Sequence, residues 1–257
     1  MFIIEYKFLI LTAWLILFRL FEGIRPAARC PDEINQKQRW FKNLGLFSLT
    51  ALSSVVIVLP VTLWASQNPL WIRSELLSSG FALIGDLIFL DFLIYWWHRA
   101  NHQIAFLWRF HEIHHLDRFL DTTTALRFHF AEVLLSAVFR CVVIILCAIP
   151  LRHILVFETL VMMAALFHHS NVKLPRSLEK WMSWFFVTPS IHWVHHHALK
   201  KDTDQNYATI LSLWDRLFRT KSPTHRWPKM PIGVDFGKAT AVKDLAFLPL
   251  LLRPFTK

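Results

Sequence analysis

The stretch "WWHRANHQIAFLWRFHEIHH", Trp96–His115, marks the point where a long apolar segment gives way to a polar one, and five of its twenty residues are histidine. Apolar side chains dominate positions 76–97, whereas polar and charged side chains are frequent from 98 to 132. A run of about twenty apolar residues is long enough to cross a bilayer as a helix. We therefore expect a membrane helix to end here and to continue directly into a histidine-rich segment.

The composition of the whole chain favours a membrane protein. Hydrophobic residues make up 54% of its 257 positions, which is high for a soluble domain. Apolar runs occupy five stretches, 8–22, 44–66, 76–97, 133–149 and 154–169. Only Pro150 to His153 separate the last two runs, which favours a helical hairpin that need not cross the bilayer fully. The sequence predicts an all-α integral membrane protein with about four to five hydrophobic helices.

The two ends of the chain are expected to meet the membrane in different ways. The first run lacks the small-residue cleavage site of a signal peptide and is followed by Arg25 and Arg29, so we expect an anchor. We predict N-terminal membrane helices in residues 1–75, a catalytic domain in 76–235 and a tail in 236–257. The tail contains "LAFLPLLLRPF", which suits a segment lying on the membrane interface better than another span.

The formal charge of +10 is distributed unevenly along the chain. Lys and Arg number five in 23–43, four in 98–132 and fourteen after residue 170, against one in 66–75 and one in 150–153. Such a bias places the basic loops, and with them the histidine clusters, on the cytosolic side. We expect the inner membrane in a bacterium or the endoplasmic reticulum in a eukaryote. The basic surface then faces anionic lipids or an acidic partner, and no nucleic acid is expected.

Three histidine clusters repeat a spacing that suits metal binding. They are His98 and His102 (HxxxH), His111, His114 and His115 (HxxHH), and His192, His195 and His196 (HxxHH). Positions i, i+3 and i+4 share one face of a helix, so the rings of each cluster point the same way. At the histidine frequency of this chain, about 0.04 HxxHH matches are expected by chance. The sequence contains two, which predicts a metal site.

Eight clustered histidines exceed the four to six donors that one ion takes, so we expect two metal ions. A ninth ligand is expected from "FHHSN" at the end of the fifth run, where His169 is favoured over His168. His129 stays open between a ligand and a group that orients one. His197 is rotated away from the ligand face, and His153 and His225 are expected to be structural. The three cysteines show no CxxC spacing, so neither thiolate ligands nor a disulfide framework is expected.

A histidine that binds a metal usually donates its other N–H to a carboxylate or a carbonyl. Asp91 lies seven residues before His98, on the same helix face and two turns deeper, and is expected to orient a ligand histidine. Asp204 is a second carboxylate expected in that role. Further candidates are Glu112, Asp117, Glu132 and Asp215, whereas Asp86 has no such phase relation and stays unassigned.

These motifs resemble the fatty acid hydroxylase and sterol desaturase superfamily of membrane di-metal oxygenases, especially its bacterial sterol-desaturase-like members. The resemblance covers about residues 85–235 and rests on "DFLIYWWHRANH", "RFHEIHH", "TTALRFHFAE", "FHHSN", "PSIHWVHHH" and "DQNYATILSLWDRLFRT". This chain departs where the family usually has His-Pro-x-Glu, since Phe130 follows His129. It also has Ala208 and Arg219 at positions where the family often has Gly. These departures concern the geometry of the loops, and none of them changes a residue of the three histidine clusters.

The resemblance implies a helical membrane anchor with a cytosolic cap, two iron ions, O₂ as co-substrate, and a sterol, fatty acyl or related lipid that is hydroxylated or desaturated. Zinc can occupy such a site in a purified sample, but zinc is redox-inert. The chain has no GxGxxG motif and no CxxCH haem attachment, so reducing equivalents must come from an external donor such as a ferredoxin, a cytochrome b5-like protein or a reductase.

Other classes of protein predict different patterns. A membrane metal-binding or metal-transport protein, the main alternative, would spread histidines and acids along a path through the helices. A bis-histidine haem protein needs single histidines opposed across two helices. An intramembrane metalloprotease needs HExxH, whereas His111 and Glu112 begin HExHH.

Overall fold

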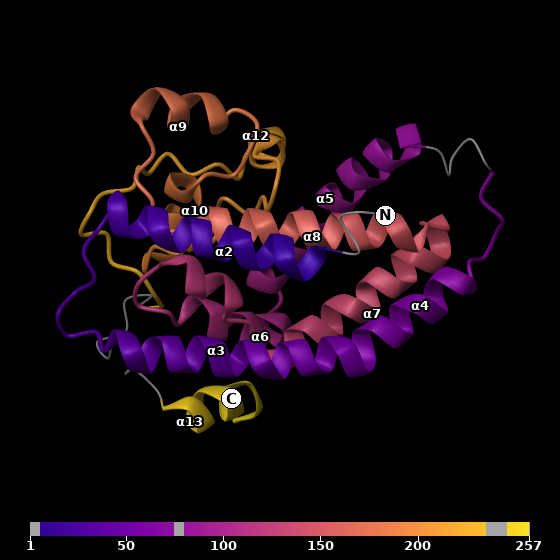
Figure 1. The fold of residues 1–257 in the computed structure, drawn as a ribbon, viewed down its shortest axis with the longest axis horizontal. Helices are drawn as coiled ribbons and strands as arrows, with labels where there is room; N and C mark the ends of the chain where they lie inside the picture. Colours follow the sequence, from indigo (N-terminus) through magenta and orange to yellow (C-terminus); the bar gives the residue numbers. More distant parts are fainter. Residues whose placement is uncertain (1–5, 75–79, 235–245, 257) are drawn as a thin grey trace.

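A computed structural model describes residues 6–74, 80–234 and 246–256 of the chain (Figure 1). Within these residues the structure is helical, and its β-structure is limited to three isolated bridges. The long helices run roughly along the longest axis of the molecule, and the short helices gather at one end (Figure 1). The expectation of an all-α fold is therefore confirmed for the described residues.

Within the described residues, four helices are long and apolar enough to cross a membrane, which makes the chain an integral membrane protein. They are the continuous α3, η1 and α4 (Gln36–Ser53, Ser54–Val58 and Leu59–Gln67), α5 (Gly80–Gln103), α7 (Phe130–Cys147) and α8 (Leu151–His169). The first apolar run forms α2 (Lys7–Ile24), which packs against α8 and donates a hydrogen bond from Trp14 Nε1 to the carbonyl of Met163 at 3.0 Å. The predicted boundary at residue 75 lies outside the described residues.

The predicted hairpin of the last two runs is present as α7 and α8. Ala148 ends α7 in the left-handed conformation, with φ of 51°, and Pro150 precedes the first turn of α8. Leu90 of α5, Ile144 of α7 and Ile154 of α8 meet in one buried apolar cluster. This packing joins α5, α7 and α8, and the far ends of α5 and α8 carry histidines.

A cap of short elements covers one end of the long helices and consists of residues 104–129 and 170–234. Its elements are α6 (Ala105–His115), η3 (Thr122–Leu126), α9 (Arg176–Met182), α10 (Pro189–His195), α11 (Lys200–Thr203) and α12 (Leu213–Leu217). The breaks suit the sequence, because Pro175 directly precedes α9 as its N-cap and Pro189 is the first residue of α10, positions where the missing N–H costs little.

The described part of the tail docks on the body of the protein. It forms α13 (Phe247–Leu252) and η4 (Arg253–Phe255), below α3 in Figure 1. The ring of Phe247 fills the space beside Gly45, where an added Cβ would lie 2.7 Å from Cε2 of Phe247. Arg253 pairs with Glu112 of α6 at 2.9 Å. The outer residues Leu248 and Leu252 stay exposed, as a segment against lipid would be.

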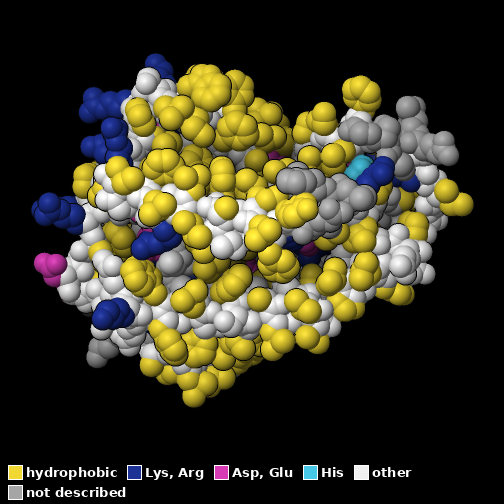
Figure 2. Space-filling view, in the orientation of Figure 1, with side chains coloured by type: hydrophobic (Ala, Val, Ile, Leu, Met, Phe, Trp, Pro, Cys, Tyr) yellow, Lys and Arg dark blue, Asp and Glu magenta, His cyan; other side chains and the backbone are white. Residues whose placement is uncertain are grey.

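The surface of the molecule separates into an apolar region and a basic end. Leu52, Val55 and Val56 of the first span are exposed, which suits a lipid-facing surface. Figure 2 shows hydrophobic side chains over most of the visible face, with Lys and Arg gathered mainly at the end where the cap lies.

Candidate metal centre

Nine histidines from four helices converge where the cap meets α5 and α8. They form a five-histidine group, His98, His102, His111, His115 and His195, and a four-histidine group, His114, His169, His192 and His196. Within each group the potential ligand atoms lie within 4.8 Å of one another. The structure therefore brings together all nine residues that the sequence singled out, in two sets.

In the five-histidine group, three rings are oriented through their Nδ1 atoms. Nδ1 of His98 lies 2.7 Å from the carbonyl of Tyr207, Nδ1 of His195 lies 2.7 Å from the carbonyl of Gln205, and Nδ1 of His111 lies 2.7 Å from Oε1 of Glu132. Each contact fixes Nδ1 as the donor, because carbonyl and carboxylate oxygens only accept. The lone pair is then on Nε2, and in His111 and His195 this buried atom has no hydrogen-bond partner. Both ring nitrogens of His102 and of His115 are also buried without one.

The four-histidine group brings Nε2 atoms even closer together. Nε2 of His169 lies 2.9 Å from Nε2 of both His114 and His192, and Nε2 of His196 lies 3.1 Å from that of His192. Nδ1 of His114 donates to the carbonyl of Arg127 at 3.2 Å, and Nδ1 of His169 donates to the carbonyl of Ala165 at 2.8 Å. The Nε2 atoms of His114 and His169 are thus two bare acceptors facing each other, an arrangement that a shared cation stabilises.

The two groups are neighbours. The rings of His115 and His196, one from each group, stack with centroids 4.2 Å apart and planes inclined by 18°. His114 and His115 are adjacent in α6 but belong to different groups. His195 and His196, at the end of α10, are likewise adjacent and belong to different groups. Two cations held by these groups would therefore lie next to each other.

The cap histidines are suited to be ligands at neutral pH. Burial, followed by the neighbouring imidazoles, holds the pKa of His114, His115, His192, His195 and His196 well below its ordinary value. A lowered pKa means that the ring stays neutral with a lone pair available, which is the form that binds metals. Crowded buried imidazoles without charge are a costly arrangement unless their lone pairs are used. The donor set therefore fits metal ions.

Aromatic side chains enclose the centre. The Trp108 ring lies 5.0 Å from that of His102, and the buried Tyr207 ring lies 5.3 Å from the same histidine. On the other side, Phe128 stacks on His114 with centroids 4.3 Å apart. These rings limit the access of water to the imidazoles.

Asp91 does not orient His98, contrary to the sequence-based expectation. Its carboxylate accepts hydrogen bonds from the backbone N–H groups of Ile210 and Leu211 and from Nε1 of Trp214, at 3.2, 3.0 and 2.8 Å. Asp91 and His98 both lie on α5, as predicted, but the donors that reach the Asp91 carboxylate come from a segment of the cap. Asp91 therefore anchors the 205–214 segment, whose carbonyls orient His98 and His195.

Asp215 anchors the same segment from its other side. Its two carboxylate oxygens accept the N–H groups of Tyr207 and Ala208 at 2.8 and 3.1 Å. Burial raises its pKa to about 6. Asp204, the other predicted orienting carboxylate, is half-exposed, and its Oδ1 lies 3.7 Å from Nδ1 of His102, beyond direct hydrogen-bonding distance.

The other acids named from the sequence act in different places. Glu132 is the one that reaches a clustered histidine, through His111. Asp117 pairs with Arg39 of α3 at 2.8 Å, and Glu112 pairs with the tail. Asp86, left unassigned from the sequence, bonds Arg73 and His153, 2.8 and 2.6 Å away, at the start of α5.

The remaining histidines lie outside both groups. His129 begins α7 as its N-cap, with Nδ1 accepting from the N–H of Ala131 and Nε2 donating to the carbonyl of Leu251. His168 is buried, with its ring 4.0 Å from that of His192. His197 points away and bonds Asp202, as its helical phase predicted.

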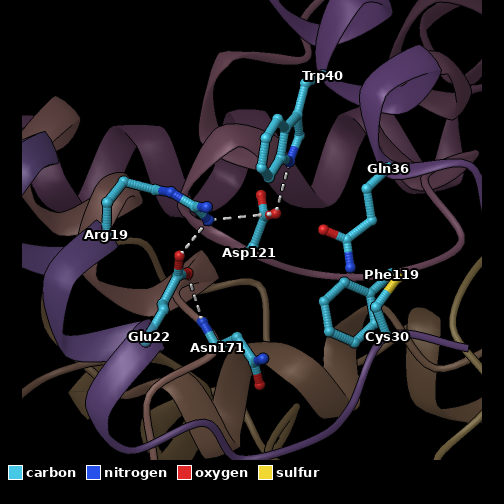
Figure 3. Close-up of a pocket in the computed structure, with 9 residues that line it drawn as sticks. Arg19, Glu22, Cys30, Gln36, Trp40, Phe119, Asp121 and Asn171 are labelled. Carbon is cyan, nitrogen blue, oxygen red and sulfur yellow. Dashed lines mark hydrogen bonds and ion pairs between the residues drawn. The ribbon is translucent and has the colours of Figure 1, made fainter.

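A buried clasp joins α2 to the cap beside His169, and sequence reasoning missed it. Oε1 of Glu22 accepts from the N–H groups of Thr122 and Asn171, at 2.7 and 2.8 Å. Figure 3 shows Glu22 between Arg19 and Asn171, in the wall of a pocket that also includes Asp121 and Trp40. The charged pair Arg19 and Glu22 in a mainly apolar helix was the available signal, because the partners from the cap lie 100 and 149 residues further along the chain.

Arg219 occupies a left-handed position. Its φ is 56°, a region that glycine enters without the steric cost that a Cβ imposes. The left-handed backbone is a physical reason for the glycine that the resemblance leads us to expect at this position. The carbonyl of the next residue, Thr220, accepts the N–H of Asn206 at 2.8 Å, so the strained turn closes the segment that orients His98 and His195.

Comparisons with known proteins identify a family and several relatives. The fatty acid hydroxylase family matches residues 83–220, which include all nine clustered histidines. An ornithine lipid hydroxylase of Rhizobium tropici is 29% identical over 194 residues, covering 76% of this chain and 54% of that protein. An alkylglycerol monooxygenase of Xenopus tropicalis is 31% identical over 138 residues, covering 52% of this chain and 29% of that protein. A cholesterol 25-hydroxylase-like protein of Danio rerio is 26% identical, covering 70% of this chain and 73% of that protein. No solved structure matches the chain.

Proposed function

This chain belongs to the fatty acid hydroxylase family, and we propose that it is a membrane lipid hydroxylase that uses O₂, two iron ions and an external electron donor. The observation that carries the proposal is the convergence of nine histidines in two adjacent groups at the end of the membrane helices. The chain spans only about half, or less, of the length of the first relatives it matches. Activity and substrate are accordingly proposals for this chain.

The proposed ligands are the nine clustered histidines, His98, His102, His111, His115 and His195 for one ion and His114, His169, His192 and His196 for the other. Bound iron would supply the redox chemistry with O₂ that oxidises an unactivated C–H bond, which zinc lacks. The protein supplies the geometry. Glu132 and the carbonyls of Tyr207 and Gln205 hold three Nδ1 protons, so each of those rings presents Nε2.

We propose that the substrate enters from the bilayer with its polar head near the cap. His98 and His102 end α5, and His169 ends α8, both of which are candidate membrane spans. A lipid chain can reach this level without crossing water, while Trp108 and Tyr207 keep water from the reacting carbon. By the bias of Lys and Arg the cap faces the cytosol. The names of the relatives, hydroxylase and monooxygenase, favour hydroxylation over desaturation.

Transport of metal is disfavoured as the function. Among the described residues, the clustered histidines lie together at one end of the long helices rather than along a path through them. A transport path needs polar groups near the membrane midplane.

Comparative lipid analysis tests the proposal. Cells that express the chain are compared with cells that express His114→Ala, and the exposed His225→Ala serves as the matched control. Hydroxylation predicts a lipid about 16 mass units heavier in wild type and in His225→Ala, and its absence in His114→Ala. A product about 2 units lighter would instead indicate desaturation. Equal lipid profiles in all three would contradict the proposal.

A further inference from the structure

His197 follows the proposed ligand His196 directly but takes no part in either histidine group. It is buried, and its Nδ1 donates to Oδ2 of Asp202 at 2.7 Å. The ring of Trp227 meets the His197 ring edge-on, with centroids 5.1 Å apart and planes at 84°. Trp227 is 40% exposed. The His197 ring and one peptide bond are therefore all that separates this surface indole from a proposed metal ligand.

The backbone holds Trp227 in this place. The N–H of Ala198 donates to the carbonyl of Pro231 at 2.9 Å, and the N–H of Gly233 donates to the carbonyl of His196 at 3.2 Å. Because of these bonds, the segment after Trp227 lies alongside the chain at His196–Ala198, where the third histidine cluster ends. The indole is thus part of a fixed surface.

Four exposed lysines lie next to Trp227 in the chain or in the segments that the bonds of Asp202 join. Asp202 accepts from His197 and from the hydroxyls of Ser222 and Thr224, both at 2.8–2.9 Å. These bonds outweigh the effect of burial and hold the pKa of Asp202 below its ordinary value. They bring together Lys200 and Lys201, which precede Asp202, and Lys221, which precedes Ser222. Lys229 lies two residues after Trp227. We call Lys200, Lys201, Lys221, Trp227 and Lys229 the Lys–Trp patch.

The patch is basic without exposed acids to offset it. Among the described residues after 170, all four of its lysines are exposed, whereas Asp202 is buried and Asp204 only half-exposed. The segment that carries Trp227 lies at the cap end of the long axis (Figure 1), where Figure 2 shows Lys and Arg gathered. The long helices point toward this end, so the patch faces away from the membrane that they would cross.

We propose that the Lys–Trp patch is the docking surface for an acidic one-electron carrier that reduces the metal centre through His197. The inference rests on the proposed function. Hydroxylation of a C–H bond follows RH + O₂ + 2e⁻ + 2H⁺ → ROH + H₂O, so two reduced carriers must each deliver one electron and leave oxidised. Lysines around one exposed aromatic give such a partner both charge complementarity and an apolar contact. Docking here brings the carrier close to His196.

Binding of an oxidised, net-negative [2Fe–2S] ferredoxin tests the proposal without any turnover. The metal-loaded protein is held in nanodiscs of neutral phosphatidylcholine, and the dissociation constant is measured at low salt. The patch variant is Lys200→Glu/Lys201→Glu/Lys221→Glu. The matched control reverses three exposed charges outside the cap, between α2 and the first turns of α3, Arg25→Glu/Arg29→Glu/Lys37→Glu. We expect the patch variant to bind about tenfold more weakly or worse, and the control to stay within about twofold of wild type.

Trp227 provides a second measurement. Trp227→Ala should weaken ferredoxin binding, and Trp227→Phe should retain most of it, because a ring still fills the apolar contact. Wild-type binding should also weaken as salt rises. Three results would each overturn the proposal. The first is that the wild type does not bind ferredoxin at low salt, and the second is that the patch and control variants lose equal affinity. The third is that the patch variant loses binding to anionic vesicles while it keeps its affinity for ferredoxin. Because binding is measured with oxidised ferredoxin and without O₂ or turnover, the result can be interpreted even if the hydroxylase proposal fails.

Discussion

The Nε2 atoms of His114 and His169 lie 2.9 Å apart, although the Nδ1 atom of each ring faces a backbone carbonyl. Neither Nε2 therefore has a proton to offer the other. Two buried lone pairs at this distance repel each other unless a cation lies between them or one ring gains a proton. Burial and the surrounding imidazoles oppose protonation, as the lowered pKa of His114 indicates. The fold is thus arranged to favour a bound metal.

Removal of metal should lower the stability of the protein. A ligand that binds only the folded state stabilises it by about 4 kcal/mol when present at a thousandfold excess over its dissociation constant. We expect chelation to lower the melting temperature of the detergent-solubilised protein by several degrees, and added Fe²⁺ to restore it. A melting temperature that is the same with and without chelator would contradict this prediction.

Glu132→Gln should weaken metal binding while the protein stays folded. Glu132 is buried and accepts the proton of His111 Nδ1 at 2.7 Å. The loss of such an orienting carboxylate usually costs about 10–100-fold in metal affinity. The matched control is Glu158→Gln in α8, which pairs with Lys7 and Arg140 away from the site. Competition with a metal chelator measures both. Equal affinities in the two variants would show that Glu132 does not orient a ligand.

Asp91→Asn should lower stability more than it lowers metal content. The carboxylate accepts three hydrogen bonds from the cap segment that contains Ile210 and Trp214. Leaving buried donors without acceptors costs about 1–3 kcal/mol in unfolding free energy. Thermal unfolding and metal analysis of the same samples separate the two effects. Loss of metal with unchanged stability would restore the earlier expectation that Asp91 orients His98.

Arg219→Gly should stabilise the protein. Glycine removes the steric cost of φ near 56°, and although it also loosens the unfolded chain, we expect a net gain of about 0.5–1 kcal/mol. Arg219→Ala keeps a Cβ at the strained position and should bring no gain. The comparison is made by thermal unfolding. A gain in the alanine variant as large as in the glycine variant would mean that loss of the arginine side chain, rather than relief of strain, is responsible.

The nine clustered histidines could be predicted because helical spacing is a local property. Rings at i, i+3 and i+4 share a face whatever the rest of the chain does, so three clusters at the ends of apolar runs indicated a common site. The four candidate spans of the described residues coincide with four of the five apolar runs in the sequence, and the first run, expected to be an anchor, forms α2. The preference for His169 over His168 agrees with the geometry, since the atoms of His169 join the four-histidine group.

The partners of the carboxylates could not be predicted, since they depend on contacts between distant segments. Asp91 lies on the expected face of its helix, but its carboxylate accepts hydrogen bonds from residues about 120 positions later in the chain. His129 caps a helix and meets the tail at Leu251, which no local pattern reveals. Among the candidate acids, only the folded structure distinguishes Glu132, which faces His111, from Glu112, which faces the tail.

The metal content of the purified protein tests the central claim most directly. Protein loaded with iron under anaerobic conditions, washed and analysed by inductively coupled plasma mass spectrometry should contain about two metal ions per chain, as its two histidine groups require. His195→Ala should reduce this toward one, whereas the exposed His225→Ala should keep two. One ion or fewer in the wild type, or two in His195→Ala held as tightly as in the wild type, would contradict the account.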